Sequence, residues 1–113
     1  GCAQLEHLDE FIASKRKIAK EYAAFFKNID NIDFFEEPED CFSNYWLNAV
    51  ILKDKATQLE FLEYTNDNGI MTRPIWELMN RLPMFRHCQN DGLKNTFWFA
   101  DRVVNIPSSV RLE

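Results

Sequence analysis

The sequence predicts a small α+β domain: a mixed sheet of about three strands packed with one long N-terminal helix and two shorter helices. Three observations predict this class. An amphipathic stretch lies near the start, a strand–helix–strand pattern lies in the middle, and a helix followed by a strand lies near the end. The length of 113 residues, with 46% hydrophobic and 27% charged residues, is typical of one folded domain that spans residues 1–113.

Charge and cysteine content exclude several classes of function. The formal net charge of −5 argues against a nucleic-acid or anionic-membrane partner, because such binding needs a basic patch. No apolar run approaches the ~20 residues of a membrane span. Cys2, Cys41 and Cys88 lack the Cys-x-x-Cys spacing of a zinc site or redox pair. We therefore expect a reduced, cytoplasmic protein without a metal site.

The first predicted element is a long amphipathic helix over residues 4–27. Apolar residues recur three or four positions apart, from Leu5 and Leu8 to Tyr22 and Phe26. A helix of roughly 22 residues is about 33 Å long and overhangs a domain of this size. We therefore expect the chain to be part of a larger protein, in which this helix bridges two parts.

An acidic, turn-prone stretch follows at residues 28–40. Its carboxylates lack the glycine and the regular ligand positions of a calcium-binding loop. We therefore predict a solvated connecting loop here.

Residues 45–74 are predicted to form a βαβ-like unit. The continuous apolar run at 45–52 is typical of a strand buried on both faces. Residues 70–73 indicate a second strand, which Pro74 ends because it lacks the N–H of the ladder. If the two strands are parallel, their crossover is right-handed.

The helix inside this unit carries both of its end signals. Asp54 can cap its start, and Gly69 suits the left-handed position just past its end. We expect Leu59, Leu62 and Tyr64 on its inner side.

The loop predicted at residues 75–91 holds more apolar side chain than a surface turn needs. Loops that carry function are positioned by a rigid scaffold. We therefore interpret residues 69–85 as the lining of a site, with a loop tucked over a small core as the alternative. A short helix and a third strand follow within residues 92–107.

Arg73 and Trp76 are the candidate substrate-binding residues. A guanidinium fork matches a carboxylate or a phosphate, and a strand end followed by proline holds Arg73 rigidly. Trp76 can stack on a flat ligand ring. The alternatives are an ordinary surface arginine and a tryptophan packed on the sheet. His87 and Cys88 are sequence neighbours, but nucleophile dyads assemble in space, so they receive no catalytic role.

Four short motifs, in this order, resemble the DegT/StrS-type sugar-nucleotide aminotransferases. Residues 69–85 look most like the branch that acts in bacillosamine and legionaminic acid pathways. The motifs are Gly-Cys-Ala-Gln-Leu-Glu-His-Leu-Asp-Glu-Phe-Ile at 1–12, Asn-Tyr-Trp-Leu at 44–47, Asn-Gly-Ile-Met-Thr-Arg-Pro at 68–74 and Val-Asn-Ile-Pro-Ser-Ser at 104–109.

The resemblance implies the C-terminal small domain of a bacterial pyridoxal-phosphate (PLP) aminotransferase with the aspartate-aminotransferase fold. Such enzymes move an amino group, usually from glutamate, onto a keto group of a nucleotide-linked sugar. The cofactor lysine of the family lies in its large domain, and no lysine here has the matching setting. The resemblance therefore implies no catalytic residue in this chain, and PLP bound only by the full-length protein.

The resemblance also implies partners and site residues. The partners are the large PLP-binding domain of the same protein, the nucleotide-sugar substrate and a second copy in a homodimer. Arg73 is a ligand for the donor carboxylate or for the sugar nucleotide, and no histidine role passes to His87.

Two other classes of function stay open. The chain can be a stand-alone α+β binding or dimerisation module, without enzymatic activity, that uses exposed aromatic residues as its interface. A small Cys/His enzyme is the third, and it requires a lowered pKa for the Cys88 thiol.

Overall fold

The first helical region of the computed structural model, which describes residues 1–110, is divided in two. α1 (Cys2–Leu5) is a single turn, and α2 (Leu8–Phe26) continues for 19 residues. His7 separates them with φ −106° and ψ 11°, outside the helical range. The prediction of a single helix over 4–27 is therefore wrong at its N-terminal end. The apolar residues keep their helical spacing across His7, so their pattern does not reveal a break at one residue.

Four strands form one sheet in the order β1-β2-β4-β3 in the described part of the chain, and each neighbouring pair is antiparallel. The predicted α+β class is confirmed. The sheet has four strands rather than about three, and its neighbours are not mixed in direction. The strands are β1 (Ile32–Phe34), β2 (Asn48–Leu52), β3 (Arg73–Pro74) and β4 (Val103–Ile106).

β1 lies inside the stretch that the sequence predicts as a solvated loop. Ile32 is buried and Phe34 is half-buried, with the exposed Asp33 between them. Three alternating residues among acidic neighbours give too short a periodic signal to distinguish a strand from a loop. Pairing with β2, which is distant in sequence, decides the outcome.

α3 (Lys55–Asp67) connects β2 to β3. Both strands are antiparallel to β4, so they run parallel to each other, but β4 lies between them. β2 begins at Asn48 rather than at 45, since Tyr45 has a φ of 45°. β3 contains Pro74, which its position at the sheet edge permits, because an unpaired edge needs no donor.

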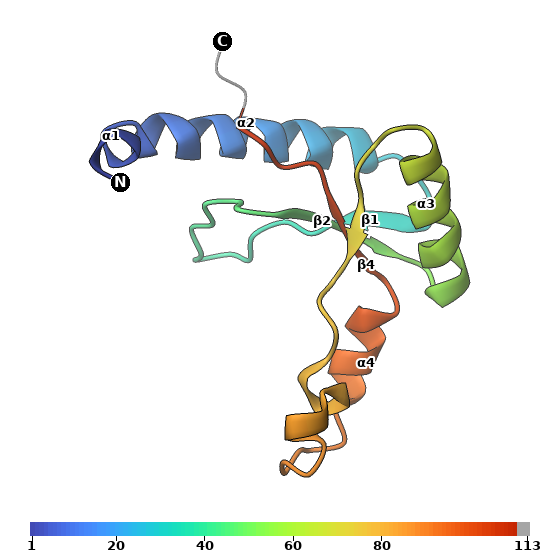
Figure 1. The fold of residues 1–113 in the computed structure, drawn as a ribbon. Coiled ribbons are helices and arrows are strands. Elements are labelled where there is room, and N and C mark those ends of the chain that lie inside the picture. Colours follow the sequence, from blue (N-terminus) through green and yellow to red (C-terminus); the bar gives the residue numbers. More distant parts are fainter. Residues whose placement is uncertain (111–113) are drawn as a thin grey trace.

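Both long helices pack against the same face of the sheet, as Figure 1 shows. The strand register places the inward residues of β1, β2 and β4 opposite one another on that face. α2 contributes Tyr22 and Phe26 to this core, and α3 contributes Phe61 and Leu62. The buried core residues from the sheet are Ile32, Val50, Leu52, Val104 and Ile106.

The ends of α3 are those that the sequence predicts. The Asp54 carboxylate accepts a hydrogen bond from the Thr57 backbone N at 2.9 Å, and this bond lowers the pKa of Asp54. Gly69 has a φ of 75° just past the helix.

The inner face of α3 differs from the prediction. Leu59 and Tyr64 are exposed, and of the three expected residues only Leu62 packs against the core. The innermost residue is Gln58, which is fully buried. Its Nε2 donates to Ala100 O at 3.0 Å and to Val103 O at 2.8 Å. A polar residue that satisfies buried carbonyls carries no apolar signal, so periodicity alone points to the wrong face.

Residues 75–101 form a lobe that projects from the sheet on the side away from α2 (Figure 1). The lobe contains η1 (Met79–Arg81), η2 (Pro83–Phe85) and α4 (Lys94–Ala100). The radius of gyration is 16.4 Å, against about 13 Å for a globular chain of this length. Within residues 1–110, the helices are too short or too polar to cross a bilayer.

Candidate functional site

A cleft of about 870 Å³ lies where the first half of α2, the segment before β2, the β3 edge and the exit of β4 meet. It brings together residues that are far apart in the sequence. Its polar lining is Lys15, Arg73, Asn105, Ser108 and Ser109, and its apolar lining is Trp46, Leu47, Met71, Pro74, Trp76, Ile106 and Pro107.

Two tryptophans form the aromatic wall of this cleft. The ring centroids of Trp46 and Trp76 are 6.2 Å apart, and their planes meet at 28°. Trp46 is 65% exposed and Trp76 is 68% exposed. The structure therefore places Trp76 in the cleft, stacked on a second tryptophan, and not buried against the sheet. The sequence alone gives Trp46 no ligand role, because no local pattern links two residues that are 30 positions apart.

A buried threonine positions Arg73. Thr72 Oγ1 lies 2.6 Å from Thr65 Oγ1, and Asn66 Nδ2 donates to Thr72 O at 3.1 Å. Thr72 and Thr65 are both buried. These bonds fasten the chain to the end of α3 immediately before Arg73, and Arg73 itself pairs with Asn105 of β4.

The Arg73 guanidinium itself makes only one weak contact with the described residues. Its Nη2 lies 3.4 Å from Met71 Sδ, which is a weak acceptor. Within residues 1–110, no carboxylate forms an ion pair with Arg73. The register places Arg73 opposite Asn105, which also lines the cleft. A free guanidinium fork beside an amide is suited to an anionic ligand.

Lys15 fastens two walls of the cleft to α2. Its Nζ donates to Ser108 O at 2.5 Å and to Trp46 O at 3.3 Å. The Ser108 hydroxyl accepts from Asn48 N at 2.7 Å and donates to Ile106 O at 2.8 Å. Ser108 therefore completes the exit of β4, which leaves its hydroxyl committed to the backbone.

The segment that carries Trp46 is fastened by an ion pair to the same helix. Arg16 Nη1 donates to Glu37 Oε2 at 2.9 Å, and Ser43 N donates to the same oxygen at 2.6 Å. The Tyr45 hydroxyl accepts from Glu37 N at 3.1 Å. The hydrogen bond from Arg16 is the main reason that the pKa of Glu37 falls to about 2.

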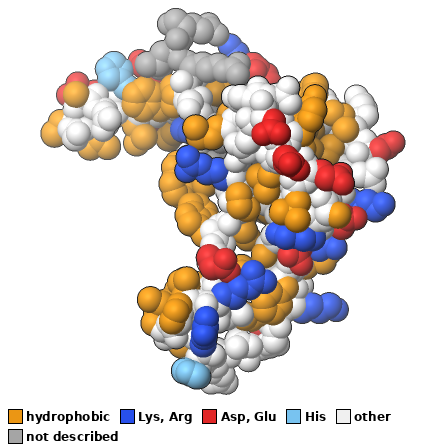
Figure 2. All heavy atoms as spheres, turned by 45° about the vertical axis from the view of Figure 1, so that its right-hand side comes forward, with side chains coloured by type: hydrophobic (Ala, Val, Ile, Leu, Met, Phe, Trp, Pro, Cys, Tyr) orange, Lys and Arg blue, Asp and Glu red, His pale blue; other side chains and the backbone are white. Residues whose placement is uncertain are grey.

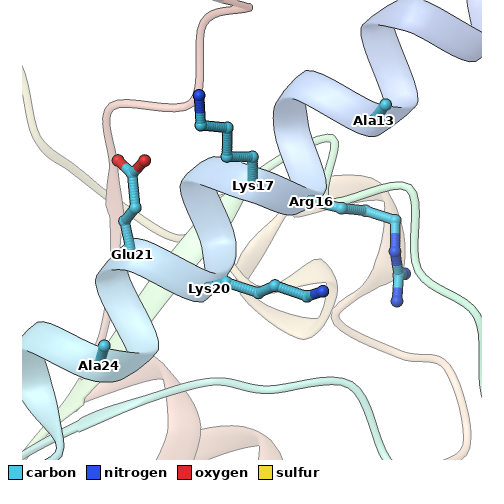
Figure 3. Close-up of a pocket in the computed structure, with 6 residues that line it drawn as sticks. All are labelled: Ala13, Arg16, Lys17, Lys20, Glu21 and Ala24. Atoms are coloured by element: carbon cyan, nitrogen blue, oxygen red, sulfur yellow. The ribbon is translucent and has the colours of Figure 1, made fainter.

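Two other hollows within residues 1–110 do not have the character of a site. Figure 3 shows a hollow of about 560 Å³ along α2, between Ala13 and Ala24. All of its lining comes from one helix, and its arginine, Arg16, is already bonded to Glu37. A hollow of about 440 Å³ in the lobe includes Cys88 but not His87, so the structure does not build a Cys/His dyad there.

The lining of the cleft is better suited to contact a substrate than to attach PLP covalently. A Schiff base requires a lysine whose amine is free to react. Among the residues that line the cleft, the only lysine is Lys15, and its amine donates to two backbone carbonyls. The residues that line the cleft therefore do not fit PLP as its covalent holder. The two charged residues of the lining, Lys15 and Arg73, are both cationic although the chain carries a net charge of −5.

Comparison with known proteins places the whole chain in one group. Residues 1–113 match the model of the DegT/DnrJ/EryC1/StrS aminotransferase family. GDP-perosamine synthase of Escherichia coli O157:H7 is 31% identical over 111 residues, which cover 96% of this chain and 29% of that protein. The putative pyridoxal phosphate-dependent aminotransferase EpsN of Bacillus subtilis (strain 168) is 29% identical over 85 residues, which cover 75% of this chain and 22% of that protein.

A solved structure shares the fold. The crystal structure of the aminotransferase TlmJ from Streptoalloteichus hindustanus gives a TM-score of 0.85 at 20% identity, over 96% of this chain and 29% of that one. The chain thus spans less than a third of the length of each of these proteins.

Proposed function

Because the chain belongs to the DegT/DnrJ/EryC1/StrS aminotransferase family, we propose that it is the C-terminal small domain of a PLP-dependent sugar-nucleotide aminotransferase. In this proposal the full-length enzyme transfers an amino group, from glutamate, to a keto group of a nucleotide-linked sugar. The match of all 113 residues to the family model is the observation that carries the proposal. The names of the E. coli and B. subtilis relatives support the sugar substrate and the cofactor.

The exposed surface of the chain supports a large partner domain. A free-standing protein of 13.4 kDa has about 6,500 Å² of accessible surface, whereas this chain has 8831 Å². The excess on this chain is roughly 2,300 Å², which is enough for its side of a permanent interface, because such interfaces bury about 2,000–5,000 Å² summed over both partners. Figure 2 shows hydrophobic side chains over much of the surface of both the sheet body and the lobe. We assign this surface to the large PLP-binding domain of the same protein and to a second copy in a homodimer.

The chain's own residues act on the substrate side of this active site. PLP, held by the large domain through a lysine outside these 113 residues, carries the chemistry of amino transfer. Arg73 binds an anionic group of a substrate, and Trp76 covers a flat part of it. Arg73 and Trp76 orient the substrate in the cleft and exclude water from it, and no residue of this chain forms a covalent bond to the substrate.

The test is spectroscopic and uses the full-length protein. We expect a yellow protein whose visible absorbance shifts when glutamate is added. Borohydride is expected to fix the chromophore to one lysine outside residues 1–113. A colourless protein that takes up no PLP contradicts the proposal and leaves the stand-alone binding module as the better account.

The identity of the sugar is a second, separate question. The resemblance of residues 69–85 favours the bacillosamine and legionaminic acid branch, whereas the name of the E. coli relative points to perosamine. Turnover of the keto-sugar nucleotides of these pathways, compared under equal conditions, decides between them.

A further inference from the structure

We propose that Glu37 is a positioning residue of the cleft: it holds the loop at residues 35–47 in one conformation and thereby fixes the indole of Trp46 against Trp76. This inference rests on the proposed function, because it gives the loop a task in the substrate site of the full-length enzyme. Glu37 does not line the cleft itself. It therefore acts through Trp46 and does not touch the substrate.

The loop at residues 35–47 has almost no interior of its own. It leaves the sheet after β1, lies beside the first half of α2 and returns at β2 (Figure 1). Glu37, Ser43 and Tyr45 are half-buried, whereas the other residues of the loop are exposed. The conformation of the loop therefore depends mainly on what these three residues contact.

The backbone directly before Trp46 is strained. Tyr45 has a φ of 45°, in the left-handed region that bulky side chains disfavour. Such a conformation persists only where surrounding contacts hold it, and strain of this kind is commonest at functional sites. The direction of the Trp46 side chain depends on this turn, because the two residues are adjacent. Release of the strain would therefore move the indole.

Glu37 is at the centre of the bonds that hold the strained turn. Its carboxylate accepts from Ser43 N at 2.6 Å and from the Arg16 guanidinium at 2.9 Å. Its own backbone N donates to the Tyr45 hydroxyl at 3.1 Å, and Tyr45 N donates to Ser43 Oγ at 3.0 Å. All three half-buried residues of the loop thus belong to one network, which ends at the residue before Trp46.

The ion pair that supports this network has the geometry of a strong one. Most exposed ion pairs contribute little, but a two-bond arginine–carboxylate pair within a network is an exception. Arg16 and Glu37 are 23% and 21% exposed. The guanidinium carbon of Arg16 also lies 4.1 Å from the ring centroid of Phe42. Lys15, the preceding residue of α2, donates to Trp46 O, so one helix holds both the middle and the end of the loop.

Circular dichroism of the full-length protein tests the positioning without any substrate. Two indoles with centroids 6.2 Å apart couple and give a paired band, which Trp46→Ala and Trp76→Ala each remove. We expect Glu37→Gln to lose most of this band, because glutamine has one acceptor oxygen and no charge. Tyr45→Phe removes the hydroxyl that accepts from Glu37 N and is expected to lose a smaller part. Glu36→Gln, in an exposed neighbour, is expected to keep the whole band.

Steady-state kinetics tests whether the position of Trp46 matters to the substrate. The keto-sugar nucleotides of the perosamine and bacillosamine pathways serve as probes, with glutamate as the amino donor. We expect Glu37→Gln to raise the KM for the best of these nucleotides about tenfold and to leave kcat within about twofold, the pattern of a lost binding contact. Added to Trp46→Ala, the same change is expected to raise KM by less than about twofold, because the residue through which it acts is already gone.

Each result bears on one proposal. A full band in both Glu37→Gln and Tyr45→Phe overturns the positioning, whatever the enzyme catalyses. An effect of Glu37→Gln on KM that persists undiminished in the Trp46→Ala protein also overturns it, because Glu37 then acts on the fold in general. Loss of the band in a protein that takes up no PLP supports the positioning of Trp46 and contradicts the proposed aminotransferase activity.

Discussion

Arg16 on α2 and Glu37 in the segment before β2 form a two-bond ion pair across 21 positions of sequence. The two side chains are mostly shielded from solvent, at 23% and 21% exposed. Arg16 also donates to Ser43 O at 2.7 Å, so one guanidinium closes both sides of the loop. The same loop ends at Trp46. The Arg16–Glu37 pair and the neighbouring Lys15, which donates to Trp46 O, therefore together set the position of Trp46.

Glu37→Gln is expected to loosen residues 35–47 at pH 7. In the folded protein Arg16 holds the pKa of Glu37 at about 2, below its ordinary value of 4.5. The stabilisation is therefore complete above about pH 4.5 and is lost as the pH falls towards 2. Hydrogen-exchange protection of the loop amides in the full-length protein should be lower in the variant at pH 7, and the difference should shrink below pH 4.5. Glu36→Gln, an exposed neighbour, should not behave this way.

Arg73→Ala in the full-length enzyme is expected to raise the KM for the sugar nucleotide by about 10- to 100-fold, since a hydrogen bond to a charged group contributes about 1.5–3 kcal/mol. Arg73→Lys should recover only part of this, because an ammonium lacks the planar fork. Steady-state kinetics with both substrates provides the measurement. Unchanged kcat and unchanged KM for both substrates would remove Arg73 from the site.

Gln58→Ala is expected to lower the free energy of opening of β4 by about 2 kcal/mol. The change leaves the buried carbonyls of Ala100 and Val103 without their donor and opens a cavity. Native-state hydrogen exchange at the β4 amides measures it. Glu60→Ala, on the exposed side of α3, is the matched control. Equal exchange in both variants would show that the Gln58 bonds contribute nothing to the sheet.

Asp54→Ala is expected to speed hydrogen exchange in the first turn of α3, where the carboxylate accepts from Thr57 N. Asp54→Asn should behave like wild type, because an asparagine caps a helix about as well. Equal hydrogen-exchange rates in Asp54→Ala and Asp54→Asn would mean that neighbouring residues hold the first turn of α3, and not the cap.

Local signals account for the parts of the fold that the sequence predicted. The cap at Asp54, the left-handed Gly69 and the apolar strand β4 each depend on a few neighbouring residues. β1 and the position of β4 between β2 and β3 depend on pairing between distant segments. A single sequence carries no periodic signal for such pairing.

The site also has parts that the sequence predicts and parts that depend on contacts between distant segments. Residues 69–85 stood out because their side chains were too apolar for a solvated loop, and the structure places Arg73 and Trp76 from this stretch in one cleft. The other walls came from elsewhere. Trp46 reaches Trp76 across 30 positions, and Lys15 reaches Ser108 across 93. The sequence predicts a solvated acidic loop because the partner of Glu37, Arg16, lies in a different element.

The position of β4 has a consequence for synthesis on the ribosome. β4 is made last of the four strands, yet it pairs with both β2 and β3. About 50 residues separate β2 from the end of β4. At about 5–20 residues per second, β2 therefore waits roughly 3–10 s with an open edge. Throughout that interval the nascent chain offers one unpaired edge of an apolar strand to chaperones and to neighbouring chains.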